Sequence, residues 1–292
     1  MSNQPSLKKY SGNCHCGAFK FSFEAPEPLT TAVECDCSIC FKKGYIWEGP
    51  IDPACFVVEK GSIEELSNYE FSTKTVPHKF CPTCGTAVFA RNTESVVPAE
   101  RANKFFVNLR AVNNIDIYTL SLAPKLEFAQ LDGAYVEPPF ISPSADTLAS
   151  VPDGSRVYHG NCHCGAVRYA FIHAGPALTE ALECNCSICS RDAAAWIYPP
   201  TTSVTFSPDS QSSITEYTFG RKRTYHGFCK LCGVAVYERF VGLNDAGQDR
   251  ALRTALNTRT IAQSELDFST LNLSMGDGRS AGGLYTVNES SI

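Results

Sequence analysis

The sequence predicts a mostly β protein with short helices, built as two tandem domains, and three observations support this prediction. Short segments alternate apolar and polar residues between Gly, Pro and Ser, which is typical of strands. An ordered pattern of seven cysteines occurs twice along the chain. The length of 292 residues suits two domains of about 100–200 residues each.

The second half of the chain repeats the first at a spacing of 148 or 149 residues. Residues outside the cysteine motifs repeat as well: Trp47 and Trp196, His78 and His226, Asn108 and Asn257, Arg110 and Arg259. A period this long indicates a duplicated domain rather than a solenoid. We predict a first domain over 1–140, a linker with proline and serine over 141–156, and a second domain over 157–292 with a polar tail.

Six segments are predicted as strands or remain ambiguous. "AFKFSFE" places Phe19, Phe21 and Phe23 on one face, and "AVRYAFI" does the same with Val167, Tyr169 and Phe171. "CGTAVFAR" and "CGVAVYER" are expected to begin as knuckles and continue as strands, and "FFVNLRAV" is expected to be a strand. The pattern of "SIEELSNY" fits a helix or a strand edge.

The composition excludes some classes of function. Hydrophobic residues make up 43% of the chain, enough for a core, and the net charge of −5 argues against nucleic-acid binding. No apolar run has the length of a membrane span, and the first residues lack the apolar segment of a secretory signal. We therefore expect a cytoplasmic protein without a membrane partner. In that reducing setting, fifteen cysteines indicate metal ligands before disulfides.

Four cysteines of each half have the spacing of a structural zinc site. A four-thiolate site takes its ligands from two short knuckles, here a C-x-C and a C-x-x-C pair. The expected sets are Cys14, Cys16, Cys81 and Cys84 in the first half, and Cys162, Cys164, Cys229 and Cys232 in the second. Zinc binding can contribute about 10–16 kcal/mol, against about 5–15 kcal/mol for the net stability of a domain. We expect loss of one such thiol to unfold its domain.

The other three repeated cysteines of each half form a C-x-C-x-x-C triad: Cys35, Cys37 and Cys40, and Cys184, Cys186 and Cys189. Three protein ligands leave the fourth zinc position open, as in catalytic sites, and an external thiolate suits that position. Two other interpretations stay open. One is a structural zinc with a fourth ligand elsewhere, for which the repeated candidates are His15, His78, His163 and His226. The other is a metal-free cluster of reduced thiols.

Several other residues have mainly structural interpretations. We expect the two tryptophans to be core or pocket wall, and Arg110 and Arg259 to form structural ion pairs rather than to bind a carboxylate. Asn108 and Asn257 fit a ligand or a backbone contact equally well. Cys55 has no repeated partner and is expected to be a small buried side chain.

These motifs resemble the glutathione-dependent formaldehyde-activating enzyme family, which includes centromere protein V-like proteins. The resemblance covers both halves through "GNCHCG", "ECDCSIC" or "ECNCSIC", and "HKFCPTCG" or "HGFCKLCG". It implies two tandem β-tent-like zinc domains, with structural zinc at the four-cysteine sets and catalytic zinc at the triads, up to four Zn2+ per chain. The second half departs from the pattern, because "CSRDAAAW" keeps only Arg191 and lacks the glycine found in "CFKKGYIW".

The resemblance also implies an activity, that of a zinc-dependent carbon–sulfur lyase similar to S-hydroxymethylglutathione synthase. Its co-substrate would be glutathione, and its other substrate a small carbonyl or a thiol adduct, possibly a larger thiol conjugate of specialised metabolism. The catalytic residues would be Cys35, Cys37, Cys40, Cys184, Cys186 and Cys189. The alternative is a non-catalytic zinc scaffold or a buffer of metal and thiol.

Overall fold

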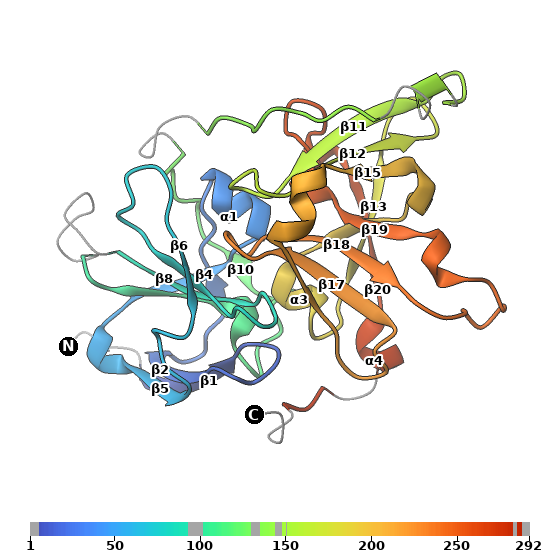
Figure 1. The fold of residues 1–292 in the computed structure, drawn as a ribbon. Helices are drawn as coiled ribbons and strands as arrows, with labels where there is room; N and C mark the ends of the chain where they lie inside the picture. Colours follow the sequence, from blue (N-terminus) through green and yellow to red (C-terminus); the bar gives the residue numbers. More distant parts are fainter. Residues whose placement is uncertain are drawn as a thin grey trace. The chain divides into compact units, whose positions relative to one another are not determined.

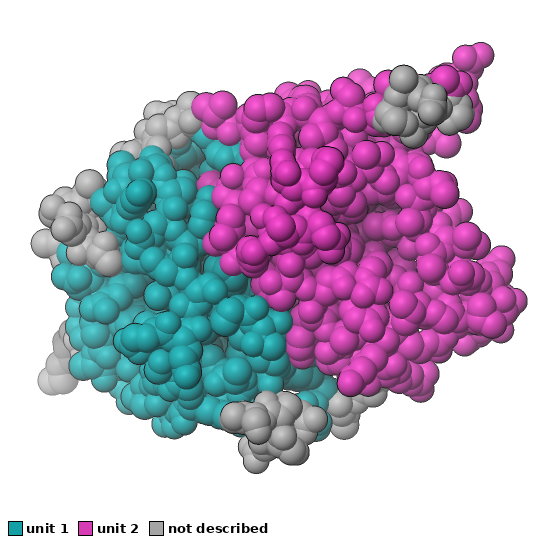
Figure 2. All heavy atoms as spheres, in the orientation of Figure 1, with its two compact units in different colours: residues 1–135, 285–292 teal, residues 136–284 magenta. Residues whose placement is uncertain are grey.

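A computed structural model describes residues 6–92, 102–129, 135–143, 148–149, 151–282 and 285–287. The chain divides into two compact units, unit 1 with residues 1–135 and 285–292 and unit 2 with residues 136–284 (Figure 2). The predicted mostly β class is confirmed, because strands dominate and the helices α1, α3 and α4 have only six, four and five residues. The predicted boundaries at 140 and 157 stay a prediction.

Unit 1 contains two antiparallel sheets and one short parallel pair (Figure 1). The first sheet has the order β1 (Leu7–Asn13), β2 (Lys20–Pro26), β5 (Phe56–Lys60). The second has the order β4 (Trp47–Ile51), β9 (Phe105–Asn108), β8 (Ala87–Arg91), β7 (His78–Phe80), β6 (Ser67–Tyr69). The parallel pair is β3 (Thr31–Ala32) with β10 (Ser121–Leu122). The short helical elements are α1 (Ser38–Lys43), η1 (Pro53–Cys55) and η2 (Leu109–Ala111).

Unit 2 repeats this arrangement with a longer second sheet. Its three-stranded sheet has the order β11 (Arg156–Asn161), β12 (Arg168–His173), β15 (Val204–Phe206). Its seven-stranded sheet has the order β16 (Ile214–Tyr217), β17 (Thr224–Cys229), β18 (Ala235–Phe240), β19 (Thr254–Asn257), β14 (Ala195–Ile197), β13 (Glu180–Cys184), β20 (Asn272–Gly276). The short helical elements are α3 (Cys189–Asp192), α4 (Gly278–Gly282), η3 (Thr201–Ser203), η4 (Pro208–Ser213), η5 (Arg250–Leu252), η6 (Thr258–Thr260) and η7 (Phe268–Thr270).

The two larger sheets share one strand order, since β16–β17–β18–β19–β14 repeats β6–β7–β8–β9–β4. In unit 2 the sheet continues through β13 and β20. In unit 1 single bridges occupy the equivalent places, Val33 with Trp47 and Cys35 with Leu126. The first cysteine of each triad therefore lies at the end of the extended segment next to β4 or β14. This residue is Cys35 in unit 1 and Cys184, the last residue of β13, in unit 2.

Aromatic side chains link the two sheets of each unit. In unit 1 the ring of Phe56 lies 5.4 Å from Phe21, 5.3 Å from Phe89 and 4.5 Å from Phe105. The alternating aromatic residues predicted to share a face are all buried, Phe19, Phe21 and Phe23 at 2% exposure or less. Burial of about 150–250 Å² by each such ring makes it a main source of hydrophobic stabilisation.

Two segments differ in part from their predicted form. The strand in "FFVNLRAV" ends at Asn108, because the Asn108 side chain accepts a hydrogen bond from the Arg110 amide and starts the 3-10 turn η2. The ambiguous "SIEELSNY" contains no helix and becomes strand β6 only over its last three residues.

Candidate metal centres

Each triad is built from the end of an extended segment and the start of a short helix. Cys184 is the last residue of β13, and Cys189 is the first residue of α3. In unit 1, Cys37 is the N-cap of α1 with extended backbone angles, and Cys40 lies in its first turn. This change from extended to helical backbone turns the three side chains toward one point.

The three sulfurs of each triad lie within 4.8 Å of one another. Ligands at about 2.3 Å from one tetrahedral zinc are about 3.8 Å apart, so this spacing fits a shared ion. The backbone amide of Cys37 donates to the sulfur of Cys35 at 3.4 Å, and that of Cys186 donates to Cys184 at 3.5 Å. Such amides stabilise a thiolate, as a metal site requires.

The first sulfur of each triad is the favoured thiolate. Hydrogen bonds from the Cys37 and Cys40 thiols lower the pKa of Cys35 to about 4, and the equivalent bonds lower the pKa of Cys184 to about 2. The same interaction with Cys35 raises the pKa of Cys37 to about 12, while burial raises that of Cys40.

The four-cysteine sets of the prediction also come together. Cys14, Cys16, Cys81 and Cys84 form one cluster with sulfurs within 4.8 Å, and Cys162, Cys164, Cys229 and Cys232 form the other. The Cys16 sulfur lies 3.5 Å from Cys14 and 3.6 Å from Cys81, far beyond a disulfide bond of about 2.05 Å. These separations are close to the edge of a zinc tetrathiolate, so both sets can hold a metal ion.

The knuckles have the backbone that a shared ion needs. Gly17 and Gly85 have φ of 76° and 75°, and each donates its amide to the carbonyl of the first cysteine of its knuckle, at 2.9 Å. This left-handed conformation favours glycine. The amide of Phe19 also donates to the Cys14 sulfur at 3.3 Å. The sequence motifs C-x-C-G and C-x-x-C-G thus provide both the sulfurs and the turn.

Arg110 and Arg259 bind the C-terminal ends of α1 and α3, the short helices that carry the third cysteine of each triad. The Arg110 Nε donates to the Gly44 carbonyl at 2.6 Å, and the Arg259 Nε donates to the Ala193 carbonyl at 2.8 Å. Gly44 and Ala193 are the left-handed C-caps of α1 and α3. An ion pair of the expected kind joins Arg259 to Glu183, with 4.0 Å between their charged atoms. The main role of both arginines is to bind a helix C-terminus, which favours cations.

The asparagines next to these arginines contact the backbone, one of their two predicted roles. Asn108 is fully buried, and its Nδ2 donates to the Ala87 carbonyl at 3.0 Å. Asn257 is also fully buried and donates to the Ala235 carbonyl at 2.9 Å. Each side chain therefore ties the end of the strand that precedes the arginine to the strand that follows a knuckle.

The four candidate histidines do not join the sulfur clusters. Among the described residues, the groups of potential ligand atoms within 4.8 Å of one another contain cysteines alone. His226 is buried and its Nδ1 lies 2.9 Å from Glu238 Oε1. That same Glu238 oxygen lies 3.6 Å from the Cys189 sulfur. Sequence reasoning missed Glu238, although its difference from Ala90 at the repeated position was a signal.

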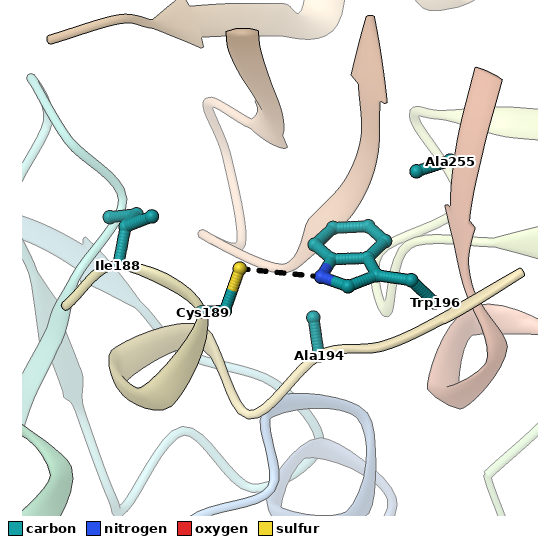
Figure 3. Close-up of a cluster of buried hydrophobic side chains, with 5 residues drawn as sticks. All are labelled: Ile188, Cys189, Ala194, Trp196 and Ala255. Atoms are coloured by element: carbon teal, nitrogen blue, oxygen red, sulfur yellow. Dashed lines mark hydrogen bonds between the residues drawn. The ribbon is translucent and has the colours of Figure 1, made fainter. Parts of the chain in front are cut away.

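Both tryptophans are buried, as expected for core or pocket wall, and Trp196 contacts the second triad. Trp196 is 2% exposed, and its Nε1 donates to the Cys189 sulfur at 3.4 Å (Figure 3). Ile188, Ala194 and Ala255 pack in the same cluster. In unit 1, Trp47 is 4% exposed and stacks on Tyr45 with a ring distance of 4.2 Å. Apolar surroundings of this kind limit water around the sulfurs.

The basic pair after the first triad is buried rather than solvated. Lys42 is 1% exposed with its amino group 5.8 Å from the Tyr135 ring centroid, and the Lys43 amino group lies 4.8 Å from Phe80. The expectation that Cys55 is buried was wrong, because it lies at the end of the surface turn η1 and is partly exposed.

A pocket of about 470 Å³ opens beside β13 and β14 of unit 2. Trp196, Leu182, Tyr198, His173 and Arg253 are among its lining residues. None of the lining residues is a triad cysteine, but Trp196 both lines this pocket and donates to the Cys189 sulfur. In the described part of the chain, no helix is both long enough and apolar enough to cross a membrane.

A comparison with protein-family models agrees with the duplicated pattern. A family model described as "Glutathione-dependent formaldehyde-activating enzyme" matches residues 9–127 and 157–262. Each matched segment contains one complete set of seven repeated cysteines. A solved structure of a protein from Rhodobacter sphaeroides has 27% identity, covers 39% of this chain and 99% of its own, and has a TM-score of 0.33.

Proposed function

Because the chain belongs to the glutathione-dependent formaldehyde-activating enzyme family, we propose that it is a zinc-dependent carbon–sulfur lyase of the S-hydroxymethylglutathione synthase type. The observation that supports this most is the pair of three-sulfur clusters, one in each unit, beside the separate four-sulfur clusters. Three ligands are one fewer than a closed structural zinc site uses, which leaves a position for a substrate.

The proposed reaction joins a thiol to a carbonyl. The glutathione sulfur attacks the carbonyl carbon of formaldehyde or a related small carbonyl and forms the C–S bond. The carbonyl π pair moves to the oxygen, which takes up the proton that the thiol has lost, so no atom is released. Bound zinc would supply stabilisation of a thiolate at neutral pH. The reverse reaction breaks the same C–S bond.

The chain's own residues hold this site in shape. The ligands would be Cys35, Cys37 and Cys40 in unit 1, and Cys184, Cys186 and Cys189 in unit 2. Arg110 and Arg259 fix the helix that carries the third cysteine of each triad, through their bonds to the Gly44 and Ala193 carbonyls. The buried ring of Trp196, whose Nε1 donates to the Cys189 sulfur, limits water near that sulfur. Water exclusion strengthens electrostatic stabilisation of the charge on oxygen.

The four-sulfur clusters would hold structural zinc, giving up to four ions per chain. The fit rests on the sulfur spacing and on the glycine turns beside the thiols. We also place the protein in the cytoplasm, where reducing conditions keep thiols free. A larger thiol conjugate as the substrate of one unit is a variant of the same proposal, motivated by the divergence between "CFKKGYIW" and "CSRDAAAW".

The test compares Cys37→Ala, Cys186→Ala and the double variant with Cys55→Ala, a thiol outside all four clusters. Formation of S-hydroxymethylglutathione is measured by NMR exchange above the uncatalysed rate, together with zinc per chain and circular dichroism. We expect the double variant to lose the excess rate while keeping its fold and the zinc of the four-sulfur clusters. The excess rate surviving in the double variant would reject the proposal.

The alternative, a metal or thiol buffer, makes a different prediction for the unchanged protein. It predicts no rate above the uncatalysed reaction and four zinc ions that resist a mild chelator equally. It is supported by the fact that fourteen of the fifteen cysteines lie in clusters able to hold a metal. The same zinc count and rate measurement therefore separate the two functions.

A further inference from the structure

The C-terminal residues of the chain, expected from the sequence only as a polar tail, belong to unit 1 and not to the unit that precedes them. Unit 2 covers residues 136–284, and the chain returns to unit 1 from Tyr285 onward. The two changes of unit, at Val136 and at Tyr285, are 149 residues apart (285 − 136 = 149), which is the spacing of the sequence repeat. The same point of the repeat therefore ends the first unit and the second unit.

Tyr285 contacts the C-x-C knuckle of the first four-sulfur cluster through three interactions. Its hydroxyl donates to the His15 carbonyl at 2.5 Å and accepts from the Asn13 side-chain amide at 3.1 Å. Its ring centroid lies 4.6 Å from that of His15. Asn13 and His15 are only 2% and 3% exposed, so Tyr285 packs on residues that are shielded from water.

His15 is the residue between Cys14 and Cys16, the two candidate metal ligands of this knuckle. Its amide donates to the Thr86 hydroxyl at 3.1 Å, and Thr86 lies two residues after Cys84 of the second knuckle. The backbone of His15 is thus held at its amide by the second knuckle and at its carbonyl by Tyr285. Because movement of this residue would displace both neighbouring cysteines, the Tyr285 contacts oppose local opening of the cluster.

The segment that follows the first change of unit covers the equivalent knuckle of unit 2. A Cβ on Gly165, the glycine of the second C-x-C-G motif, would lie 2.7 Å from Pro138 Cγ, so the proline packs directly on this turn. The Phe140 ring stacks on His159 of β11 with a centroid distance of 4.6 Å. The Arg168 guanidinium donates to the carbonyl of the residue between the proline and the phenylalanine at 3.2 Å.

We infer that residues 138–140 and 285–287 are two equivalent straps, each of which holds the C-x-C knuckle of one four-sulfur cluster. The strap of unit 2 is the part of the chain that leaves the first domain, and the strap of unit 1 is the part that leaves the second. The knuckle around His15 consequently depends on a residue 270 positions later in the sequence. These straps act on the four-sulfur clusters whatever reaction the triads carry out.

Hydrogen exchange followed by mass spectrometry, on the full chain in excess zinc and without substrate, tests the strap of unit 1. Tyr285→Ala should speed exchange over residues 13–19 at least about tenfold, because it removes two hydrogen bonds and a ring contact. Residues 161–167 should keep the wild-type rate. Tyr285→Phe keeps the ring and should give a smaller increase. The matched control is Thr286→Ala, an exposed neighbour that should leave both segments unchanged.

The reciprocal variant for unit 2 is Phe140→Ala, and its control is Val136→Ala, at an 81% exposed position of the same segment. Phe140→Ala should speed exchange over residues 161–167 and leave residues 13–19 unchanged. Val136→Ala should leave both segments unchanged. Circular dichroism checks the fold of every variant.

Unchanged exchange over residues 13–19 in Tyr285→Ala would overturn the strap of unit 1, and unchanged exchange over residues 161–167 in Phe140→Ala would overturn that of unit 2. An equal increase over both segments in either variant would also overturn the corresponding strap, because the contact would then not act locally. Either result can occur while the triads still catalyse the proposed reaction, so failure of the straps and failure of the proposed function are distinguishable.

Discussion

Replacing Arg259 with alanine should destabilise unit 2 by about 2–4 kcal/mol, and the contacts of this residue give the magnitude. Its bond to the Ala193 carbonyl is 2.8 Å long and joins a charged donor to a helix end, a type worth about 1.5–3 kcal/mol. The guanidinium lies 4.2 Å from the Phe268 ring centroid, which adds about 0.5–1 kcal/mol. The Glu183 contact at 4.0 Å is long and adds at most a few tenths of a kcal/mol.

Denaturation by urea, followed by tryptophan fluorescence and circular dichroism, tests this estimate. A loss of this size in a domain of about 150 residues lowers the melting temperature by about 4–16 °C. The matched control is Arg253→Ala, because Arg253 also donates to a backbone carbonyl, that of Tyr198 at 3.0 Å, but is exposed. We expect the control to cost less than about 1 kcal/mol.

Equal losses for Arg259→Ala and Arg253→Ala would refute the reasoning, because burial and attachment to the α3 terminus would then have no effect. A loss confined to Arg259→Ala but restored by Arg259→Lys would show that charge near the helix end matters more than the directed Nε bond. We expect lysine to restore less than half, since it cannot present the planar donor group.

Two further predictions concern packing and metal uptake. Gly160→Ala should destabilise unit 2 by about 1–3 kcal/mol in urea denaturation, because a Cβ at this position would lie 2.2 Å from the buried Tyr169 ring. The control is Gly276→Ala, which should be close to neutral because the nearest atom to its Cβ would be 3.4 Å away. Metal uptake by the first triad should release about two protons, because the pKa of Cys37 is raised to about 12, the pKa of Cys40 is also raised, and both thiols must ionise to bind. The metal affinity should therefore fall as the pH falls. An indicator dye in weak buffer measures the released protons, and no proton release would contradict the prediction.

The sequence alone determined the parts of this protein that depend on local chemistry and spacing. The seven-cysteine pattern predicted the sulfur groupings, and the alternation of Phe19, Phe21 and Phe23 predicted a strand. Each of these needs only neighbouring residues or an internal copy for comparison. The assignment of four sulfurs to one cluster and three to the other followed from the same spacing, and the geometry agrees with it.

Only the tertiary structure decided which distant side chains contact the second triad and the short helix that carries its third cysteine. Arg259 reaches Ala193 across 66 residues, and Glu238 reaches Cys189 across 49, so no local pattern relates them. The deciding quantity is strand register, because a shift by one residue would turn Glu238 to the opposite face of β18. Pairing of His226 with Glu238 fixes that register and brings the carboxylate to the sulfur, a placement that the sequence of either strand leaves undefined.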